Sequence, residues 1–303
     1  MIETIRDMGL GKMRNIFSIN RVLNRNTIQL TTENCAVSLV RYLSQGERNG
    51  RVFVIGDIHG EFLSLMSALH AVDFNFDNDL AIFVGDILDR GKNSGKCLDL
   101  LQEPWVRSTF GNHEWMMLDT VDKTGLITGN ISEWVSNGGE WALGESQEDL
   151  AKWRHHLLDR VPLYWILERR DMSLVLVCHA EPEPAYLADV IALKDRQVSV
   201  QALGGSQTIW GRSIIYNALS DKLKHKQYNI IKQFKDILFS AHGHTPVETP
   251  IWINNQLFTD TGAVSGRRLT LVDIDVAAPG LSKGIYSWDV LSQKLLSIAA
   301  YDL

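Results

Sequence analysis

Cysteine is scarce in this sequence, and long apolar runs are missing. The 303 residues include three cysteines, Cys35, Cys97 and Cys178, which are odd in number and widely spaced. Such a set excludes a disulfide framework and is typical of a protein in a reducing compartment. No stretch approaches the roughly 20 apolar residues that a membrane-spanning helix requires. We therefore expect neither disulfides nor a membrane as a partner.

A signal peptide and an excess of positive charge are also missing. The N-terminus mixes charged and apolar residues and lacks a small-residue cleavage site, so we expect a cytoplasmic protein. Secretion without a cleaved signal would leave no mark in the sequence. The formal net charge of −6 argues against nucleic acid as the main partner. A hydrophobic share of 45% is typical of a packed globular chain rather than a disordered one.

Residues 1–50 differ in composition from the rest of the chain. They carry seven basic residues against four acidic ones, and their apolar periodicity is weak. Within them, the range 32–43 predicts a short helix. We interpret residues 1–50 as a surface extension of unknown role, with docking of a partner as the sharper alternative. No repeat or low-complexity linker divides residues 51–303, which we expect to form one domain.

From residue 51 onward, short apolar runs alternate with helical patterns. Runs that end at or near a glycine predict three buried strands, at 52–55, 80–84 and 105–110. Helical spacing follows each of these runs. Later runs predict further strands, at 163–167, 174–178 and 237–241, and hairpin-like strands beyond residue 246. The alternation predicts an α/β (mixed α+β) fold in which some strands pair in parallel.

Polar residues follow five of these predicted strands directly. They are Asp57 and His59, Asp86 with Asp89 and Arg90, Asn112 with His113 and Glu114, His179, and His244. Ligands bind at the carboxyl ends of strands in open α/β sheets, so we expect these side chains to lie close together. Asp, Asn and His are ligands for Mn²⁺, Fe²⁺ and Zn²⁺. Each segment alone could be a helix cap, a turn or a hydrogen-bonded histidine at a strand end, but five in this order predict a metal site.

The motifs resemble those of the phosphoprotein phosphatase (serine/threonine phosphatase) family of the metallophosphoesterase superfamily. The bacterial and bacteriophage lambda phosphatase-like branch is the most similar. The resemblance extends over residues 51–275 and includes three more segments: Trp134…Asn137-Gly138-Gly139…Trp141, Trp210-Gly211-Arg212 and Asp260-Thr261-Gly262-Ala263-Val264. It implies a calcineurin-like metallophosphoesterase fold, a central β-sandwich flanked by helices, and makes residues 51–303 the catalytic domain.

The resemblance also implies a role for each residue at the strand ends. Asp57 and His59 would bind one metal ion, Asp86 would bridge two ions, and Asn112, His179 and His244 would complete the second site. The implied cofactors are two divalent metals, Mn²⁺ first, with Fe or Zn as alternatives. A hydroxide shared by the two ions would attack phosphorus in line, without a phosphoenzyme.

Four further residues would handle the phosphate and the proton. His113, paired with Asp89, resembles the acid that protonates the leaving alkoxide. Arg90 and Arg212 resemble a phosphate clamp, because a guanidinium offers two parallel donors.

Trp134 and Trp141 could either wall the active-site cleft or serve as buried packing. His242 we interpret as supporting the site or the structure rather than as a ligand.

The implied activity is that of a metal-dependent phosphomonoesterase. We expect a serine/threonine protein phosphatase that acts on a phosphorylated protein or peptide, with dual specificity left open. The alternatives are a dinucleoside polyphosphate hydrolase or phosphodiesterase of the same superfamily, and a non-catalytic binding module. The motif at 243–246 lacks the second His that phosphodiesterases of the superfamily carry. Symmetrical diadenosine tetraphosphatases typically lack an Asp at the position of Asp89 and have Asp at the position of Glu114. Both features favour the phosphatase, and the filled ligand positions disfavour the binding module.

Overall fold

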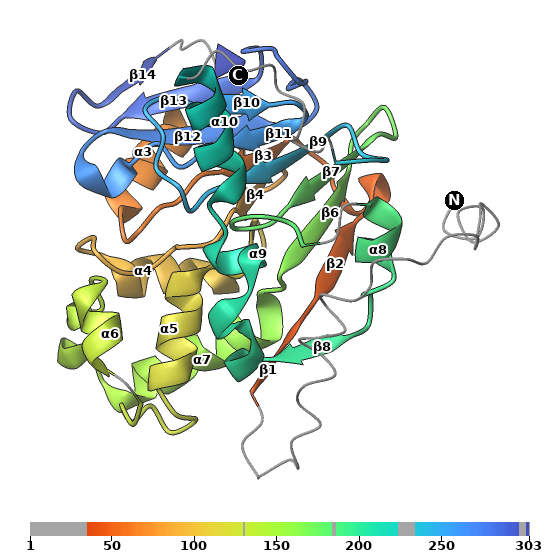
Figure 1. Cartoon of the computed structure of the whole chain (residues 1–303). Coiled ribbons are helices and arrows are strands. Elements are labelled where there is room, and N and C mark those ends of the chain that lie inside the picture. The colour runs from red at the N-terminus through yellow and green to blue at the C-terminus, as the bar shows by residue number, and fades with distance from the viewer. Residues whose placement is uncertain (1–34, 130, 184–185, 224–233, 297–300, 303) are drawn as a thin grey trace.

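The computed structural model describes residues 35–302 except 130, 184–185, 224–233 and 297–300 (Figure 1). One of its sheets has six strands, in the order β14-β13-β12-β3-β4-β5. They are β3 (Val52–Ile55), β4 (Leu80–Phe83), β5 (Val106–Ser108), β12 (Arg268–Asp273), β13 (Ile285–Asp289) and β14 (Lys294–Leu296). Strands β3, β4 and β5 pair in parallel, as the sequence predicts, whereas β12, β13 and β14 form an antiparallel edge.

The second sheet has seven strands, in the order β15-β10-β11-β9-β7-β6-β2. They are β2 (Val40–Leu43), β6 (Tyr164–Glu168), β7 (Leu174–Val177), β9 (Phe239–His242), β10 (Ile251–Ile253), β11 (Gln256–Phe258) and β15 (Tyr301–Asp302). Its central strands β7, β9 and β11 are parallel. A separate antiparallel pair joins β1 (Ala36–Ser38) to β8 (Gln197–Ser199).

The two sheets pack face to face, and alternation along the strands fills the space between them. In β3, Val52 and Val54 belong to an apolar cluster that includes Val175 and Val177 of the facing sheet. Phe53, which points the other way, packs into a cluster with helix residues. The predicted mixed fold with a central sandwich is therefore confirmed, and the sandwich fixes the strand ends in one place.

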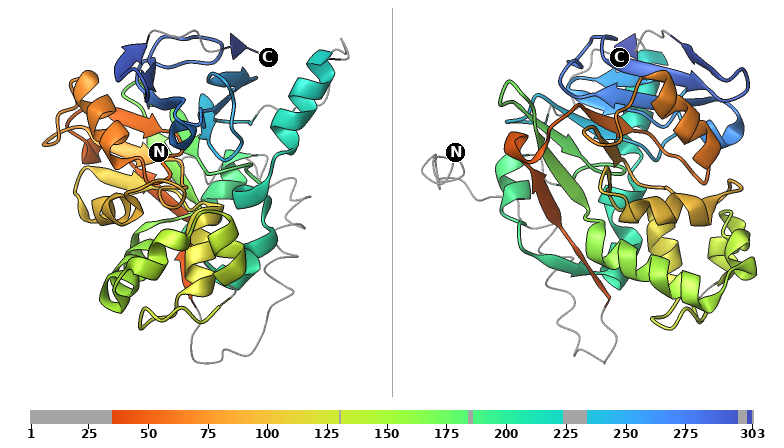
Figure 2. Two further views of the ribbon diagram at one scale, coloured as in Figure 1. Left: turned by 90° about the vertical axis from the view of Figure 1, so that its left-hand side faces the viewer. Right: turned by 180° about the vertical axis from the view of Figure 1, so that it is seen from behind.

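Helices cover the outside of the sandwich. They are α3 (Phe62–Ala71), α4 (Ser94–Asp99), α5 (Asn112–Thr120), α6 (Ile131–Ser136), α7 (Gln147–Arg160), α8 (Leu187–Ile191), α9 (Gln207–Trp210) and α10 (Ser213–Leu223). Short 3-10 turns lie at Gln45–Glu47, Leu100–Gln102, Glu140–Gly144, Val200–Gly205 and Ala263–Ser265. Helices α4 to α7 gather at one end of the molecule, away from the C-terminus (Figure 2). None of the helices in the described part of the chain is long and apolar enough to cross a membrane.

The helix predicted at 32–43 is wrong where the structure describes that range. Residues 36–43 form β1 and β2, and β2 lies parallel to β6 at the edge of the larger sheet. Val37 and Val40 are buried there, so pairing with a distant strand outweighs the local helical pattern. Residues 35–50 are thus continuous with the fold. Residues 1–34 lie outside the described residues, and a docking role for them stays a prediction.

Candidate metal centre and phosphate site

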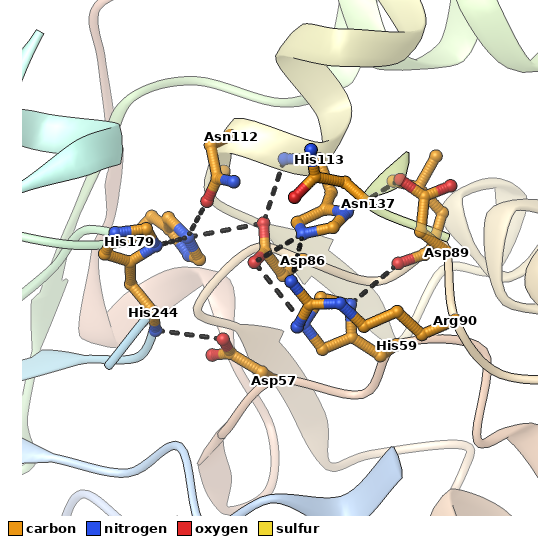
Figure 3. Close-up of polar contacts among 12 residues, drawn as sticks. Asp57, His59, Asp86, Asp89, Arg90, Asn112, His113, Asn137, His179 and His244 are labelled. Atoms are coloured by element: carbon orange, nitrogen blue, oxygen red, sulfur yellow. Dashed lines mark hydrogen bonds and ion pairs between the residues drawn. The ribbon is translucent and has the colours of Figure 1, made fainter. Parts of the chain in front are cut away.

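The side chains that follow β3, β4, β5, β7 and β9 meet at one edge of the sandwich, around Asp86 (Figure 3). The structure brings together all six predicted metal ligands, and each of them is buried: Asp57, His59, Asp86, Asn112, His179 and His244. The parallel strands β3, β4 and β5 deliver the first four, because their carboxyl ends lie at the same edge. Strands β7 and β9 of the facing sheet deliver the two remaining imidazoles.

The carboxylate of Asp86 lies between two groups of possible ligands. Its Oδ2 is 3.5 Å from Nε2 of His59, and its Oδ1 is 3.3 Å from Nε2 of His179. Among the described residues, two sets could each hold a cation, and both include Asp86: one with His59 and His113, the other with His179 and His244. A carboxylate that faces both sets is placed as a bridging ligand would be.

Each of the two imidazoles that flank Asp86 has one nitrogen fixed by the backbone. Nδ1 of His59 donates to the carbonyl of Leu88 at 2.9 Å, and Nδ1 of His179 donates to the carbonyl of Val84 at 2.9 Å. In both rings the other nitrogen, Nε2, therefore faces Asp86. A bond of this kind on the far nitrogen fixes the tautomer of a ligand histidine and orients its ring.

Two buried polar atoms of the site have no hydrogen-bond partner among the described residues. They are Oδ1 of Asp57 and Nε2 of His244, although the backbone N–H of His244 donates to the other oxygen of Asp57 at 2.9 Å. A buried polar atom without a partner is costly and rare. Divalent cations bound on either side of Asp86 would satisfy both atoms, since a carboxylate oxygen and an imidazole nitrogen suit the same metals. The residues present therefore fit a metal site.

Burial and neighbouring charges shift the pKa values of four side chains in this cluster. Burial lowers the pKa of His59 to about 3 and that of His244 to about 2, so both rings are neutral, as ligands must be. Burial, and then the Asp260 carboxylate, raises the pKa of Asp57 well above its usual value. Burial opposes a charge on His179 too, but carboxylates, Asp86 first, raise its pKa to about 9. A cation could take the place of that proton.

The turn that carries Asp86 is strained, and Glu114 holds it. Asp86 has a φ of 49°, in the left-handed region that favours glycine. The buried Glu114 carboxylate accepts the N–H groups of Asp86, Ile87 and Gly111 at 3.0, 2.9 and 2.7 Å. In the sequence, Glu114 stands out only as a difference from the symmetrical diadenosine tetraphosphatases. Its position as the third residue of α5 is a capping-box signal. Its contact with the turn after β4 has no corresponding signal in the sequence.

The predicted proton donor is placed beside the metal ligands. Nδ1 of His113 and Oδ2 of Asp89 are 2.7 Å apart, and both side chains are fully buried. The guanidinium of Arg90 donates to Nε2 of His113 at 2.9 Å and to Nε2 of His59 at 2.8 Å. Arg90 thus lies beside the candidate site that includes His59 and His113. Arg212 donates to the hydroxyl of Thr245, the residue after His244, at 3.3 Å.

Two tryptophans contact this pair in a way that sequence reasoning missed. The sequence left open whether Trp134 and Trp141 wall the cleft or pack in the interior. In the structure both indole N–H groups donate to the carboxylate of Asp89. Their spacing in the sequence carries no sign of this contact, because Asp89 lies 45 and 52 residues earlier in the chain.

Comparisons with known proteins cover the same segments. The family model described as calcineurin-like phosphoesterase matches residues 50–248, a range that contains all ten predicted site residues. Serine/threonine-protein phosphatase 1 of Salmonella typhimurium is 33% identical over 224 residues, 74% of this chain and 91% of that protein. Serine/threonine-protein phosphatase 2 of Escherichia coli is 30% identical over 230 residues, 74% of this chain and 92% of that protein. The asymmetrical bis(5'-nucleosyl)-tetraphosphatase PrpE of Bacillus cereus (strain Q1) is 28% identical over 242 residues, 72% of this chain and 87% of that protein.

Proposed function

This chain belongs to the calcineurin-like phosphoesterase family, and from that membership we propose that it hydrolyses phosphomonoesters as a serine/threonine protein phosphatase. The observation that carries the proposal is the Asp86 carboxylate, which faces two groups of metal-ligand candidates beside the His113–Asp89 pair. The names of the relatives at 33% and 30% identity support the same activity. The substrate would be a phosphorylated protein or peptide. We also propose that the protein acts in the cytoplasm, on the basis of its few cysteines and the lack of a signal-peptide pattern.

Two divalent metal ions would serve as cofactors, with Mn²⁺ expected and Fe or Zn as alternatives. One ion would be held by Asp57, His59 and Asp86, and the other by Asp86, Asn112, His179 and His244. The unpartnered atoms of Asp57 and His244 support this assignment. When bound, such ions supply Lewis acidity and a water that loses its proton at neutral pH.

The residues of the chain itself would bind the phosphate and deliver the proton. Arg90 presents a two-pronged donor between His59 and His113, where it would hold two phosphate oxygens and stabilise the charge that grows on them. Arg212 would bind from the rim beside His244. Asp89 fixes Nδ1 of His113, so Nε2, which lies beside Arg90, would be the atom that protonates the oxygen of the leaving serine or threonine.

A second candidate function is the hydrolysis of dinucleoside polyphosphates. The observation that favours it is the 28% identity to a protein named as an asymmetrical tetraphosphatase, over nearly the same share of the chain. The cluster around Asp86 would serve either substrate, since both reactions are attacks on phosphorus. The choice between them depends on the rim of the site rather than on the fold.

One assay separates the candidates. The full chain is stripped with a chelator, resupplied with Mn²⁺, Fe²⁺ or Zn²⁺, and offered four substrates: p-nitrophenyl phosphate, a phosphoserine/phosphothreonine peptide, bis(p-nitrophenyl) phosphate and diadenosine tetraphosphate. We expect turnover of the first two, greatest with Mn²⁺. Turnover confined to the last two would overturn the phosphatase proposal and favour the second candidate.

A further inference from the structure

The carboxylate of Asp89 is surrounded by more donors than its pairing with His113 requires. The indole N–H of Trp141 donates to Oδ1 at 2.7 Å, and that of Trp134 lies 3.0 Å from Oδ1 and 2.9 Å from Oδ2. His113 contacts Oδ2. Asp89 has no exposed surface, and these protein donors contact both of its oxygens.

The segment that carries the two tryptophans also fixes the neighbouring arginine. The backbone N–H of Arg90 donates to the carbonyl of Gly138 at 2.9 Å. Gly138 has a φ of 99°, and a Cβ there would lie 2.6 to 2.9 Å from atoms of Arg90. Asp89 and Arg90 themselves have φ values of 72° and 67°. Residues 134–141 therefore support both members of a strained pair whose side chains point into the site.

Packing alone does not account for these contacts. The two indole rings lie 6.1 Å apart and nearly perpendicular, and Trp141 also packs on Trp153 at 5.7 Å. Phenylalanine could supply such packing, but it has no N–H to donate. A carboxylate with one partner can rotate about its Cβ–Cγ bond. Donors on both oxygens fix its plane, and that plane sets the direction in which the His113 ring points.

We propose that Trp134 and Trp141 are positioning residues, which orient Asp89 and through it His113 so that Nε2 faces the leaving oxygen. This inference rests on the proposed function and deepens it. The two indoles matter most for esters whose leaving group needs a proton, such as the alkoxide of phosphoserine. They matter little for p-nitrophenyl phosphate, because p-nitrophenolate leaves readily as an anion. The tryptophans thereby set the preference of the enzyme for alkyl over aryl phosphates.

The test compares Trp134→Phe, Trp141→Phe and the double variant, which keep the rings and remove the N–H groups. The matched control is Trp153→Phe, because its indole belongs to the same cluster but donates to Asp99 at 2.8 Å. In the Mn²⁺-loaded full chain we expect kcat on a phosphoserine peptide to fall about threefold to tenfold for each single variant. We expect a fall of about 100-fold for the double variant, close to the loss of the acid itself. On p-nitrophenyl phosphate the change should stay within about twofold, and the control should leave the ratio of the two rates unchanged.

A second measurement excludes a merely structural effect. In a His113→Asn background the two Trp→Phe changes should cost nothing further on the phosphopeptide, since no acid remains to be oriented. Equal losses on both substrates, or undiminished losses in the His113→Asn background, would overturn the inference. A wild-type chain that hydrolyses neither monoester would instead contradict the proposed function, so the two failures are distinguishable.

Discussion

The backbone N–H of His244 donates to Oδ2 of Asp57 at 2.9 Å, across 187 residues of sequence, while Oδ1 of the same carboxylate has no partner in the described part of the chain. One oxygen of Asp57 thus fastens the end of β9 to the end of β3. The other is buried and free to coordinate. The same side chain both joins the two sheets at the site and offers a ligand atom to it.

The first prediction concerns that free oxygen. Asp57→Asn keeps the size of the side chain and removes its charge, so the affinity for one of the two metal ions should fall by at least about 100-fold. Metal content measured by elemental analysis after dialysis should drop by one ion per chain. The control Asp77→Asn changes an exposed carboxylate and should leave the metal content unaltered. A full metal complement in Asp57→Asn would contradict the assignment.

The second prediction concerns the shared carboxylate. Because Asp86 faces both candidate sites, Asp86→Asn should lose both ions where Asp57→Asn loses one. The two variants are compared in the same dialysis experiment, with titration of Mn²⁺ back into each chain. Loss of a single ion from Asp86→Asn would show that this side chain serves one site and does not bridge.

Much of this site could be predicted because it follows from strand ends. The runs at 52–55 and 80–84 were recognisable as buried strands, and the rule that parallel strands end at one edge brings Asp57 and Asp86 together. The order of the strands within the sheets was not needed. His244 follows a strand of the facing sheet, so its assignment to the same centre as Asp57 rests on the family resemblance.

The parts that could not be predicted depend on contacts between distant segments. Residues 36–43 carry a local helical pattern, but β2 forms because β6 offers it an edge. Trp134 and Trp141 lie in a short helix and a turn whose pattern indicates only burial. Their bonds to Asp89 depend on how this segment packs on the turn after β4, which no local spacing encodes.

The third prediction tests the acid. His113→Asn should lower kcat on a phosphopeptide by roughly 10²–10⁴-fold, since general acid catalysis contributes that much. Metal content should stay at the wild-type level, because both ring nitrogens of His113 have other partners, Asp89 and Arg90. Parallel kinetics and elemental analysis give both readings. If the variant loses metal together with activity, His113 is a ligand, because it belongs to the candidate set that also includes His59 and Asp86.

The fourth prediction tests the close packing behind the site. A Cβ on Gly243 would lie 1.8 Å from Oδ1 of Asp57 and 2.6 Å from a methyl group of Val84. Gly243→Ala should therefore displace the Asp57 carboxylate, lower the free energy of unfolding by about 1–3 kcal/mol and weaken metal binding. The control is Gly46→Ala, where nothing lies within 4 Å of the new atom, and its stability should change by less than about 0.5 kcal/mol. Thermal unfolding with and without Mn²⁺ checks both variants.

The fifth prediction concerns His242, which is fully buried between Cys178 and Ser240. Its Nε2 lies 2.7 Å from the hydroxyl of Ser240 and its Nδ1 lies 3.3 Å from Sγ of Cys178, so it supports the end of β9 from behind. Burial lowers its pKa from 6.5 to about 3. A group whose pKa is lower in the folded state stabilises the fold above its unfolded pKa, and that contribution is lost as the pH falls.

The expected loss for this one side chain between pH 7.5 and pH 5.5 is about 1.4 kcal/mol of unfolding free energy. His242→Gln removes the titrating group, so its stability should fall less than that of the wild type over this range, whatever its stability at pH 7.5. Urea unfolding of both chains in chelator measures the two slopes under conditions in which the other titrating groups contribute equally. Parallel pH profiles would show that the ring takes up its proton at the same pH in the folded and the unfolded chain. Burial would then not lower the pKa of His242, and the contacts with Ser240 and Cys178 would not depend on a neutral ring.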